Sequence, residues 1–315
     1  MRKNDYIFLA GHKGLVGSSV YQALKVEGFK NIITVDKKKL DLRNSDKTEK
    51  YFNKIKIDYM IMAAARAGGI LANNNNKINF FFENIEIQNS LLKLALKKKI
   101  KRTIFLGTSC IYPKFAKNPI NEKSLLTGEL EKTNQCYAIA KIAGIKLCEA
   151  LYEDHSLNIL CLMPTNVYGI NDKFDIVNGH VIPAMISKFI KAKKNNETNI
   201  KLLGSGKPIR EFINSEDLAQ AILTCLITSK KKLKKIFGEN LPIINIGSGE
   251  SVSVAKLAEI ISYTLDYKGK IIFDHKSPDG TFIKNLNSKK IRKLGWKPKI
   301  KLRNGLTEVI KSKLK

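Results

Sequence analysis

The sequence predicts an α/β protein built around a doubly wound parallel sheet, with a smaller α+β lobe beside it. Short apolar runs such as Tyr6 to Ala10 alternate with longer amphipathic stretches, which is the pattern of parallel strands joined by helices. Gly11, Gly14 and Gly17 lie between the first strand and the first helix. The 315 residues, 43% of them hydrophobic, can bury a core for one large domain or two coupled ones. Together these features favour a Rossmann-type fold.

The glycine-rich turn is the first candidate for a binding site. The strand from Tyr6 to Ala10 runs into it, and an amphipathic helix continues to about Gly28. Glycine permits a tight turn and lets backbone amides approach a pyrophosphate at the N-terminus of a helix. Because the turn follows the first strand of an alternating pattern, a dinucleotide site is the better interpretation. The residues expected to bind the cofactor here are Gly11, His12, Lys13, Gly14, Leu15, Val16 and Gly17.

The end of the second strand bears on which dinucleotide is bound. The strand from Ile32 to Val35 is followed by Asp36 and Lys37. An acidic residue at this place usually binds the ribose hydroxyls, as in NAD enzymes. Cations at Lys13 and Lys37 would instead suit a 2′-phosphate, as in NADP enzymes. The residues themselves therefore leave both cofactors open.

The third strand and the segment after it have a mixed pattern. Residues 59–65 form an apolar strand that ends in small residues, which let a cofactor lie close to the backbone. Residues 73–76 are four asparagines, which we interpret as a polar loop, with a helix cap as the alternative. Residues 80–97 are predicted to form a helix with an apolar face.

A tyrosine and a lysine follow the strand that begins at Thr103. That strand delivers Thr108 and Cys110 at its carboxyl end, where open α/β sheets bind ligands. Tyr137 and Lys141 then lie one helical turn apart on the same face. A phenol has a pKa near 10, and a neighbouring ammonium lowers it, which makes the tyrosine a usable acid or base. We expect the Thr108 hydroxyl to hold or relay the same proton.

The Tyr-x-x-x-Lys spacing by itself is a weak signal in a lysine-rich chain. Tyr21 and Lys25 have the same spacing, and we interpret them as an exposed helical pair. The Tyr137 copy differs because a strand ending in Thr-Ser-Cys and a glycine-rich turn precede it. The three features together indicate a catalytic tyrosine at the start of a helix over residues 137–154.

The regular alternation continues through a strand at residues 158–163 and ends near Gly169. The elements expected beyond it are a helix at 181–193, a strand at 200–203, a turn at 204–210, a helix at 217–229, a strand at 243–247, a helix at 253–265, a strand at 270–273 and a loop at 278–280. We therefore expect a dinucleotide-binding domain of residues 1–169 plus 214–249, and a substrate-binding lobe of residues 170–213 plus 250–315.

Charge and cysteine content set expectations about partners and location. The net charge of +28 raises the hypothesis of a nucleic-acid or anionic-membrane partner. The lysines are scattered, however, and no aromatic residues interleave with them as single-strand binding requires, so we expect no nucleic-acid partner. No signal peptide or membrane span is visible. Five cysteines without a Cys-x-x-Cys pattern indicate reduced thiols in the cytoplasm, and no metal site is expected.

Several motifs together resemble one enzyme family. They are Gly-His-Lys-Gly-Leu-Val-Gly ending at Gly17, Leu-Gly-Thr-Ser-Cys-Ile-Tyr-Pro-Lys ending at Lys114, Tyr-Ala-Ile-Ala-Lys ending at Lys141, Gly-His-Val-Ile-Pro-Ala ending at Ala184 and Gly-Ser-Gly-Lys-Pro-Ile-Arg-Glu-Phe ending at Phe212. Over nearly the whole chain they resemble the extended short-chain dehydrogenase/reductase family. The resemblance is strongest to members that act on GDP-4-keto-6-deoxy-D-mannose. It implies 3,5-epimerisation, NADPH-dependent 4-reduction and a homodimer that packs the helices at 80–97 and 137–154.

The resemblance also implies a role for each catalytic residue. The 4-keto group acidifies the hydrogens at C3 and C5, so a base can remove one and an acid can return a proton to the other face. Cys110 would be that base and His180 that acid. NADPH would then supply hydride to C4 while Tyr137, with Lys141 beside it, protonates the oxygen. In plainer interpretations, Cys110 is a small buried apolar residue and His180 caps a helix.

The remaining site residues also follow from the resemblance. Those expected on the cofactor are Asp36, Lys37, Leu106, Gly107, Thr108, Ser109, Lys141, Pro164, Thr165, Asn166, Val167 and His180. Those expected on the substrate are Lys188, Leu203, Arg210 and Asp279. The chain departs from the family pattern where Thr108 replaces a serine and Leu203 replaces a tryptophan. The implied cofactor is NADP(H), with NAD(H) left open by Asp36.

Two other functions fit parts of the sequence. One is an epimerase/reductase or 4-reductase of a related GDP-sugar, such as a heptose or dideoxy sugar. The other is a non-enzymatic dinucleotide-binding or RNA-binding protein. A plain reductase has no need of Cys110 and His180, and a non-enzymatic protein has no need of an intact Tyr137 and Lys141 pair. The presence of these residues favours the dual enzyme.

Overall fold

A parallel sheet forms the centre of the larger lobe. The computed structural model describes residues 1–276 and 279–314, and within them six strands pair in the order β2, β1, β3, β4, β5, β9. Every neighbouring pair is parallel. The strands are β1 (Tyr6–Ala10), β2 (Asn31–Ile33), β3 (Tyr59–Met62), β4 (Arg102–Leu106), β5 (Ile159–Pro164) and β9 (Ile243–Ile246). Their carboxyl ends therefore meet at one edge of the sheet.

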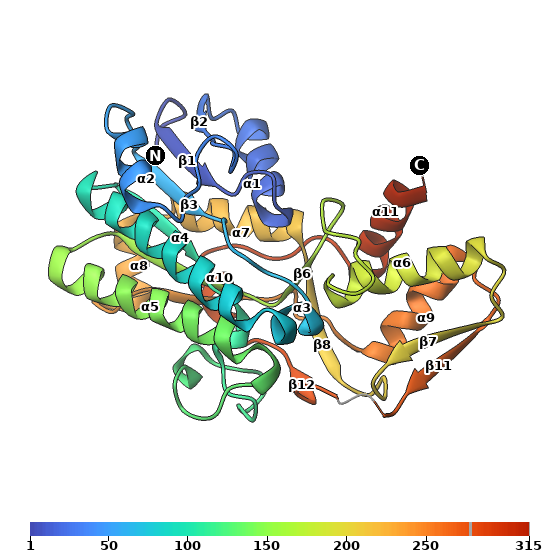
Figure 1. The fold of residues 1–315 in the computed structure, drawn as a ribbon. Helices are drawn as coiled ribbons and strands as arrows, with labels where there is room; N and C mark the ends of the chain where they lie inside the picture. Colours follow the sequence, from blue (N-terminus) through green and yellow to red (C-terminus); the bar gives the residue numbers. More distant parts are fainter. Residues whose placement is uncertain (277–278, 315) are drawn as a thin grey trace.

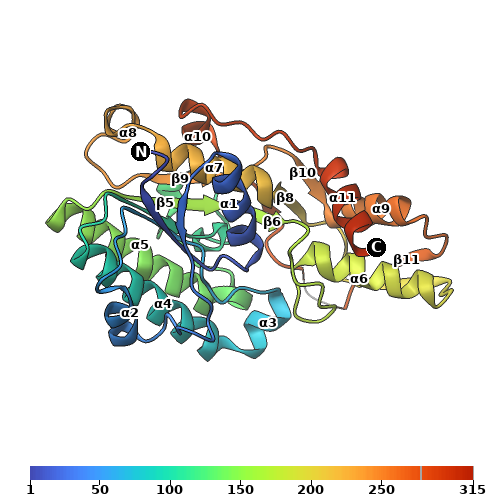
Figure 2. The same ribbon diagram turned by 90° about the horizontal axis from the view of Figure 1, so that it is seen from above.

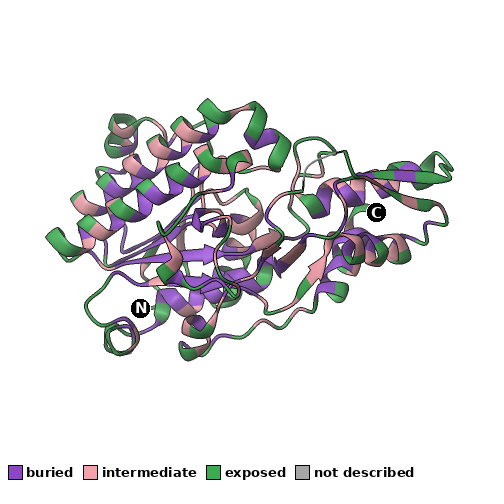
Figure 3. Cartoon of the chain, turned by 90° about the horizontal axis from the view of Figure 1, so that it is seen from below, coloured by how far each residue is buried: buried purple, intermediate pink, exposed green. Residues whose placement is uncertain are grey.

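Helices cover both faces of this sheet. In β1, Ile7 and Leu9 pack into one core cluster while Phe8 and Ala10 pack into the other, because successive strand residues point to opposite faces. One face is covered by α1 (Leu15–Val26) and α7 (Ser215–Ile227), and the other by α2 (Ser45–Phe52), α4 (Lys77–Lys97) and α5 (Gln135–His155). Figure 2 shows the two layers on either side of the sheet, and Figure 3 shows how deeply the strands are buried. The predicted fold class is confirmed.

The smaller lobe has its own core. Its helices are α6 (Val181–Lys194), α9 (Val254–Leu265) and α11 (Leu302–Leu314), which pack around residues such as Phe189, Leu257 and Leu306. A parallel pair joins β7 (Asn199–Leu203) and β11 (Lys270–Asp274). A second sheet joins β10 (Ser251–Ser253), β8 (Ile209–Asn214), β12 (Ile283–Lys284) and β6 (Asn166–Tyr168). This second sheet lies between the lobes (Figure 1).

One C-terminal segment lies on the larger lobe, although the sequence analysis assigned it to the smaller one. Leu286 belongs to one core cluster of the larger lobe, and Ile291 and Trp296 belong to the other. The segment includes α10 (Lys289–Lys293). The buried carboxylate of Glu211 joins it to β8, accepting hydrogen bonds from Leu286 N at 2.8 Å and Gly249 N at 2.6 Å. Apart from this correction, the division into two domains stays a proposal.

Several local predictions were wrong. Residues 70–75 form a helix, α3 (Ile70–Asn75), where a polar loop was expected, and α4 begins at Lys77. Asn73 Nδ2 donates to Gly68 O at 2.9 Å and Gly69 O at 3.0 Å, so the asparagine side chain bonds to the start of its own helix. A helix that the sequence analysis did not expect, α8 (Lys230–Phe237), lies between the predicted elements at 217–229 and 243–247. Part of the expected loop at 278–280 lies outside the described residues.

Short helical turns complete the larger lobe. They are η1 (Ser109–Ile111), η2 (Glu122–Ser124) and η3 (Lys132–Asn134). Two of them flank the candidate site, because η1 follows β4 and η3 precedes α5. Across the described part of the chain, no helix is both long and apolar enough to span a bilayer.

Candidate active site

The carboxyl end of β4 presents a hydroxyl and a thiol. Gly107 follows the strand, and a Cβ there would lie 2.3 Å from Met163 Sδ, so a larger residue would have to displace the Met163 side chain. Thr108 caps the short turn η1, and its Oγ1 accepts a hydrogen bond from Cys110 N at 3.2 Å. Ser109 is buried while Thr108 and Cys110 are half-buried. The turn therefore leaves the thiol accessible.

Helix α5 brings Tyr137 and Lys141 to this strand end. The Tyr137 phenol lies beside the hydroxyl of Thr108. Lys141 is buried, and its Nζ donates to Leu106 O at 2.9 Å, over the ring of Phe105 at 5.2 Å. The predicted grouping of a Thr, a Tyr and a Lys at one strand end is what the structure has. The lysine, however, bonds to the backbone of β4 and not to the phenol.

The electrostatics of this pair differ from the prediction. Tyr137 is half-buried, and burial of its phenol raises the pKa well above the ordinary value, with a smaller opposing effect from the nearby Thr108 hydroxyl. Burial also lowers the pKa of Lys141 from 10.5 to about 8. The prediction that Lys141 lowers the pKa of Tyr137 is therefore wrong for this structure, because burial dominates both groups. A phenol in this state keeps its proton at neutral pH but is a weaker acid than an ordinary phenol, so it can donate only to a strongly basic acceptor such as an alkoxide.

The sequence analysis missed Asn134, which contacts the thiol. Asn134 ends η3 and precedes α5, and its Nδ2 lies 3.3 Å from Cys110 Sγ. A hydrogen-bond donor at this distance favours the thiolate, which is the basic form of a cysteine. Beside it lies a small hollow of about 60 Å³ lined by Asn134, Cys136 and Tyr137 among others. The only signal in the sequence was a polar residue just before the Tyr-x-x-x-Lys helix.

His180 begins α6 on the other lobe. Its carbonyl accepts a bond from Ala184 N at 3.0 Å, but among the described residues its imidazole makes no capping bond. His180 is therefore the N-cap of α6, as the plainer interpretation expected, although within the described chain its side chain takes no part in the cap. The loop before it contacts the larger lobe, because Gly69 N donates to Asn178 O at 3.0 Å. Phe80 connects this contact to the catalytic helix: its ring meets the Tyr137 ring edge-on, with centroids 6.1 Å apart.

The glycine-rich turn fits a dinucleotide pyrophosphate. A Cβ on Gly17 would lie 2.0 Å from Gly11 O, and one on Gly11 would lie 2.6 Å from Ala64 N. Gly11 also has a φ of +84°, which favours glycine. The chain therefore comes close to its own backbone here and leaves the N-terminus of α1 open to an anion. Leu15 and Val16 form the first turn of that helix.

Asp36 follows β2 and is bound by both cations of the turn. Lys13 Nζ lies 2.7 Å from Asp36 Oδ1, and His12 Nε2 lies 3.4 Å from it. The hydrogen bond from Lys13 lowers the pKa of Asp36. Asp36, which was expected to bind a ribose in an NAD enzyme, is therefore paired with Lys13, which was expected to bind the 2′-phosphate of NADP.

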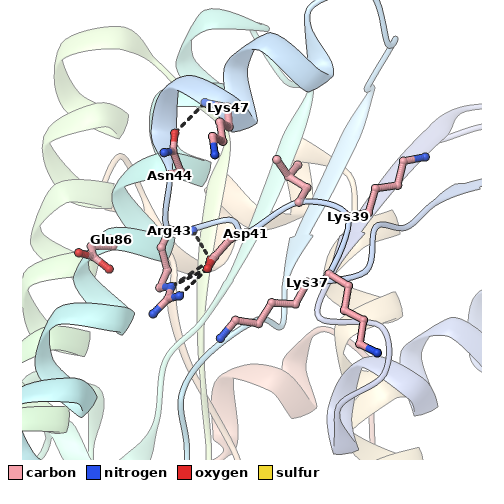
Figure 4. Close-up of a pocket in the computed structure, with 9 residues that line it drawn as sticks. Lys37, Lys39, Asp41, Arg43, Asn44, Lys47 and Glu86 are labelled. Carbon is pink, nitrogen blue, oxygen red and sulfur yellow. Dashed lines mark hydrogen bonds and ion pairs between the residues drawn. The ribbon is translucent and has the colours of Figure 1, made fainter.

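A large cationic hollow lies next to Asp36. It has a volume of about 500 Å³ and is lined by Lys37, Lys38, Lys39, Leu40, Asp41, Arg43, Asn44, Lys47 and Glu86. Figure 4 shows the lysines around it and the Arg43 guanidinium on Asp41, with Nε 2.9 Å from Oδ2. The hollow lies beyond β2, away from Tyr137 and Cys110. The sequence analysis identified Lys37 here but not Arg43 or Lys47.

The segment after β5 uses its polar side chains to bond to β8. Thr165 Oγ1 donates to Glu211 O at 2.8 Å, and Asn166 Nδ2 donates to the same carbonyl at 3.0 Å. Pro164 ends β5, and Val167 packs against the larger lobe. These predicted cofactor residues therefore also fix the strand that carries Arg210.

Two of the predicted substrate residues lie together. Asp279 accepts bonds from Ser205 N at 2.9 Å and Ser205 Oγ at 2.5 Å. Arg210 Nη1 donates to Ile209 O at 2.8 Å, and burial lowers the pKa of Arg210 while the charge of Asp279, and to a smaller extent that of Cys110, opposes the shift. Leu203 ends β7 and is 53% exposed. Lys188 lies on α6, about two turns after His180.

The fold and the site define a class. The turn between β1 and α1 is glycine-rich and fits a dinucleotide, and a hydroxyl, a phenol and a lysine lie at the end of β4. This combination is typical of a nicotinamide-dependent oxidoreductase of the short-chain type. The model of the NAD dependent epimerase/dehydratase family matches residues 7–247. The chain belongs to this family, and the resemblance to extended short-chain dehydrogenases/reductases is confirmed.

Individual relatives cover almost the whole chain. A putative GDP-L-fucose synthase 2 from Arabidopsis thaliana is 43% identical over 98% of this chain and 91% of its own length. The crystal structure of a GDP-6-OMe-4-keto-L-xylo-heptose reductase from C. jejuni is 31% identical with a TM-score of 0.91, covering 99% of this chain and 98% of that one. A GDP-L-fucose synthetase from Naegleria fowleri bound to NADP is 26% identical with a TM-score of 0.86, covering 100% of this chain and 95% of that one.

Proposed function

We propose that this enzyme carries out 3,5-epimerisation and NADPH-dependent 4-reduction of GDP-4-keto-6-deoxy-D-mannose to GDP-L-fucose. The observation that carries the proposal is the position of Thr108: its Oγ1 accepts a hydrogen bond from the amide of Cys110, and its hydroxyl lies beside the phenol of Tyr137. An epimerisation base and a reduction acid therefore lie at the same strand end. The similarity to GDP-L-fucose synthases at 38–43% identity over nearly the full chain supports the choice of substrate.

The epimerisation half needs two groups that exchange protons with carbon. The Cys110 thiolate removes a hydrogen next to the 4-keto group, and the carbonyl stabilises the resulting enolate. His180 returns a proton to the opposite face of the same carbon, which inverts it. Both side chains are partly exposed, so each can regain its starting protonation state from water between the two inversions.

The reduction half uses the enclosed phenol. NADPH supplies the hydride that reaches C4. Tyr137 protonates the C4 oxygen, and Thr108 holds the phenol in place. Lys141 orients the end of β4 through Leu106 O, and in the family pattern it also binds the nicotinamide ribose. A phenol whose pKa is raised by burial is protonated at neutral pH, and the C4 alkoxide formed by hydride transfer would be basic enough to take its proton.

NADP(H) is the proposed cofactor. Residues 11–17 would hold its pyrophosphate at the start of α1, and residues 106–109 and 164–167 would line the nicotinamide side together with Lys141 and His180. The cationic hollow beside Asp36 and Lys37 supports a 2′-phosphate, because its lysines supply positive charge at the adenosine end. Similarity to a structure bound to NADP supports the same choice.

The GDP-sugar would lie between the lobes. Arg210 and Lys188 are proposed to bind its diphosphate, since a guanidinium fork matches phosphate oxygens. Asp279 and Leu203 are proposed to lie near the guanosine end. The closeness of Arg210 to Cys110 supports this arrangement, because a sugar attached to that diphosphate then reaches the thiol.

A second candidate is a 4-reductase of a related GDP-sugar. It is favoured by the similarity to a GDP-heptose reductase at 31% identity. The two functions differ in whether carbon-bound hydrogens exchange with water. We therefore propose incubating the enzyme with GDP-4-keto-6-deoxy-D-mannose and NADPH in deuterated water. We expect deuterium at C3 and C5 of a GDP-L-fucose product, and reduction without deuterium would leave only the 4-reductase.

The matched variant for this experiment is Cys110→Ser. A serine hydroxyl is far less acidic than a thiol, so we expect deuterium incorporation to fall by about 10²- to 10⁴-fold, the range of general-base catalysis. NADPH binding, measured by fluorescence titration, should stay within twofold of the unmodified enzyme. Unchanged exchange would remove Cys110 from the mechanism.

The finer expectations about assembly and location are also proposals. A homodimer that packs α4 and α5 is supported by exposed apolar side chains on those helices, Ile78 at 69% and Phe82 at 57% on α4 and Ile139 at 41% on α5. A cytoplasmic location is supported by five free cysteines. We propose neither a nucleic-acid nor a membrane partner, since lysines 37–39 line the hollow beside β2 and the lysine-rich helix α8 buries Leu233 and Phe237.

A further inference from the structure

The carboxyl group of Asp172 faces the imidazole of His180. Asp172 Oδ1 lies 3.5 Å from His180 Nδ1 and accepts a hydrogen bond from Lys173 N at 2.8 Å. The Asp172 side chain is only 6% exposed, whereas that of His180 is 40% exposed. A buried acid therefore lies on the inner side of an imidazole whose other side is accessible.

The second oxygen of this carboxyl group lacks a partner. Asp172 Oδ2 is buried without a hydrogen-bond donor among the described residues. Leaving a buried polar group unpaired costs about 1–3 kcal/mol, and more when the group is charged. A protonated imidazole at Nδ1 supplies both a donor and a positive charge to this carboxylate. The arrangement is thus most stable with a proton on Nδ1.

The loop that carries these two residues is fixed by backbone contacts. Asp175 Oδ1 accepts bonds from Val177 N at 2.8 Å and Asn178 N at 2.9 Å. Gly179 N donates to Asp175 O at 3.0 Å, and Asn178 O accepts from Gly69 N. These bonds position the backbone of His180 but do not reach its ring. The orientation of the ring is left to Asp172.

We propose that Asp172 is a positioning residue for proton transfer by His180. This inference rests on the proposed function, in which His180 is the acid of the epimerisation. Asp172 keeps a proton on Nδ1, so the proton that leaves is the one on Nε2. In this step the N–H bond at Nε2 breaks, a C–H bond forms at the enolate carbon, and the imidazolium becomes a neutral imidazole that keeps its Nδ1–H. Asp172 does not take up the proton in this step. Its hydrogen bond at Nδ1 decides which ring nitrogen carries the proton that is transferred.

The first test compares Asp172→Asn with the unmodified enzyme in deuterated water. The variant keeps the shape of the side chain but loses its charge. We expect the formation of epimerised, deuterated product to fall on the order of 10- to 100-fold, as for a misaligned catalytic group. Reduction of the sugar that has not been epimerised should continue, so its share of the product should rise. If both activities fall by the same factor, Asp172 has only a structural role and the proposal is overturned.

Two further variants control for the loop. Asp172→Glu restores the carboxylate and should recover part of the lost epimerisation. Asp175→Asn disturbs the same loop but leaves the carboxylate that faces His180, so the share of unepimerised product should not change. A rise in that share in Asp175→Asn as large as that in Asp172→Asn would show that the loop, not the charge, matters.

A spectroscopic measurement separates this proposal from the proposed function. The chain has only four histidines, so ¹⁵N spectra of the labelled enzyme are simple, and the His180→Gln variant assigns the signal. The neutral ring should carry its proton on Nδ1, and Asp172→Asn should shift it toward Nε2. An unchanged tautomer would overturn the role of Asp172. If the unmodified enzyme shows no deuterium exchange, the proposed function is rejected. The tautomer measurement alone then decides whether Asp172 positions His180.

Discussion

The two halves of the candidate site are built in different surroundings. The reduction half lies against the central sheet, where Lys141 is buried and Tyr137 is half-buried with its ring edge-on to that of Phe80. Burial shifts both pKa values toward the neutral forms. The epimerisation half consists of Cys110 and His180, which are both partly exposed and come from different lobes.

This difference matches the chemistry of the two steps. Hydride transfer is protected when water is excluded, and the alkoxide that it produces is basic enough to take a proton even from a phenol with a raised pKa. A residue that takes a proton from one carbon, or gives one to another, must return to its first state, which is easier beside solvent. Each exposed group then needs a polar partner to favour its working form: Asn134 donates to the thiol, and Asp172 faces the imidazole.

The strongest way to separate the halves is Tyr137→Phe. The variant removes the proton donor of the reduction but leaves Cys110 and His180 in place. We expect NADPH oxidation to slow by about 10³-fold, within the range for general-acid catalysis. Deuterium exchange into the sugar should persist. Both rates are measured in one reaction, by absorbance at the nicotinamide band and by mass spectrometry of the sugar.

Tyr21→Phe is the matched control. Tyr21 and Lys25 have the same spacing on α1, and the Lys25 Nζ lies over the Tyr21 ring at 5.3 Å. This pair has no strand end beside it, so both rates should be unchanged. If Tyr137→Phe stops exchange as completely as reduction, the two halves share the phenol and the comparison drawn above fails.

Lys141 offers the next largest effect, on stability. Its pKa is lowered from 10.5 to about 8 in the folded protein. Between these two values the unfolded chain holds a proton on this lysine that the folded chain has lost, so stability must rise with pH through this window. The predicted contribution is about 3 kcal/mol, because each pKa unit corresponds to about 1.4 kcal/mol. It should be complete only above pH 10.5.

Urea unfolding of the protein without dinucleotide measures this effect. Lys141→Met cannot titrate, so its free energy of unfolding should lack the rise that the unmodified protein shows from pH 8 upward. Lys141→Arg stays charged over the same range and should lack the rise as well. Parallel curves for all three proteins would mean that the ammonium is not held in a buried site.

The reduction half was more predictable from the sequence than the epimerisation half. An apolar strand, a hydroxyl at its end and a Tyr-x-x-x-Lys pair are periodic signals, and they place Thr108, Tyr137 and Lys141 together. The same signals led to a wrong prediction for the pKa of Tyr137, which is raised and not lowered. Spacing shows which side chains share a face, but the depth of burial depends on helix packing that the local pattern does not contain.

The partners of the exposed residues could not be derived from local patterns. Asn134 lies 24 residues from Cys110, and they meet because β4 and α5 lie side by side. Asp172 is nearer to His180 in the chain. The loop between them has no periodic pattern, however, from which the contact between the two side chains could be predicted. Likewise, four asparagines at 73–76 indicated a loop, whereas α3 is stabilised by a contact between lobes, Gly69 N to Asn178 O.

The smallest predicted effect concerns Asn134, which tests whether the exposed thiol depends on its partner. Asn134→Ala removes the donor 3.3 Å from Cys110 Sγ. It should leave α5 intact, because the Asn134 side chain makes no capping bond within the described residues. We expect about a tenfold loss of deuterium exchange, the size of one hydrogen bond to a charged group. The rate of NADPH oxidation with a substrate that needs no inversion should change by less than twofold.

Thiol reactivity gives an independent measure of the same bond. Alkylation by iodoacetamide follows the amount of thiolate, so Cys110 should react more slowly in Asn134→Ala. Cys136 is also half-buried, lies close by on α5 and has no such donor among its hydrogen bonds in the described residues, so its alkylation, followed in the same peptide digest, is the internal reference. If Cys110 reacts at its original rate while Cys136 is also unchanged, the amide does not hold the thiolate. The exposed half of the site would then owe its basicity to Arg210, whose charge lies close to Cys110.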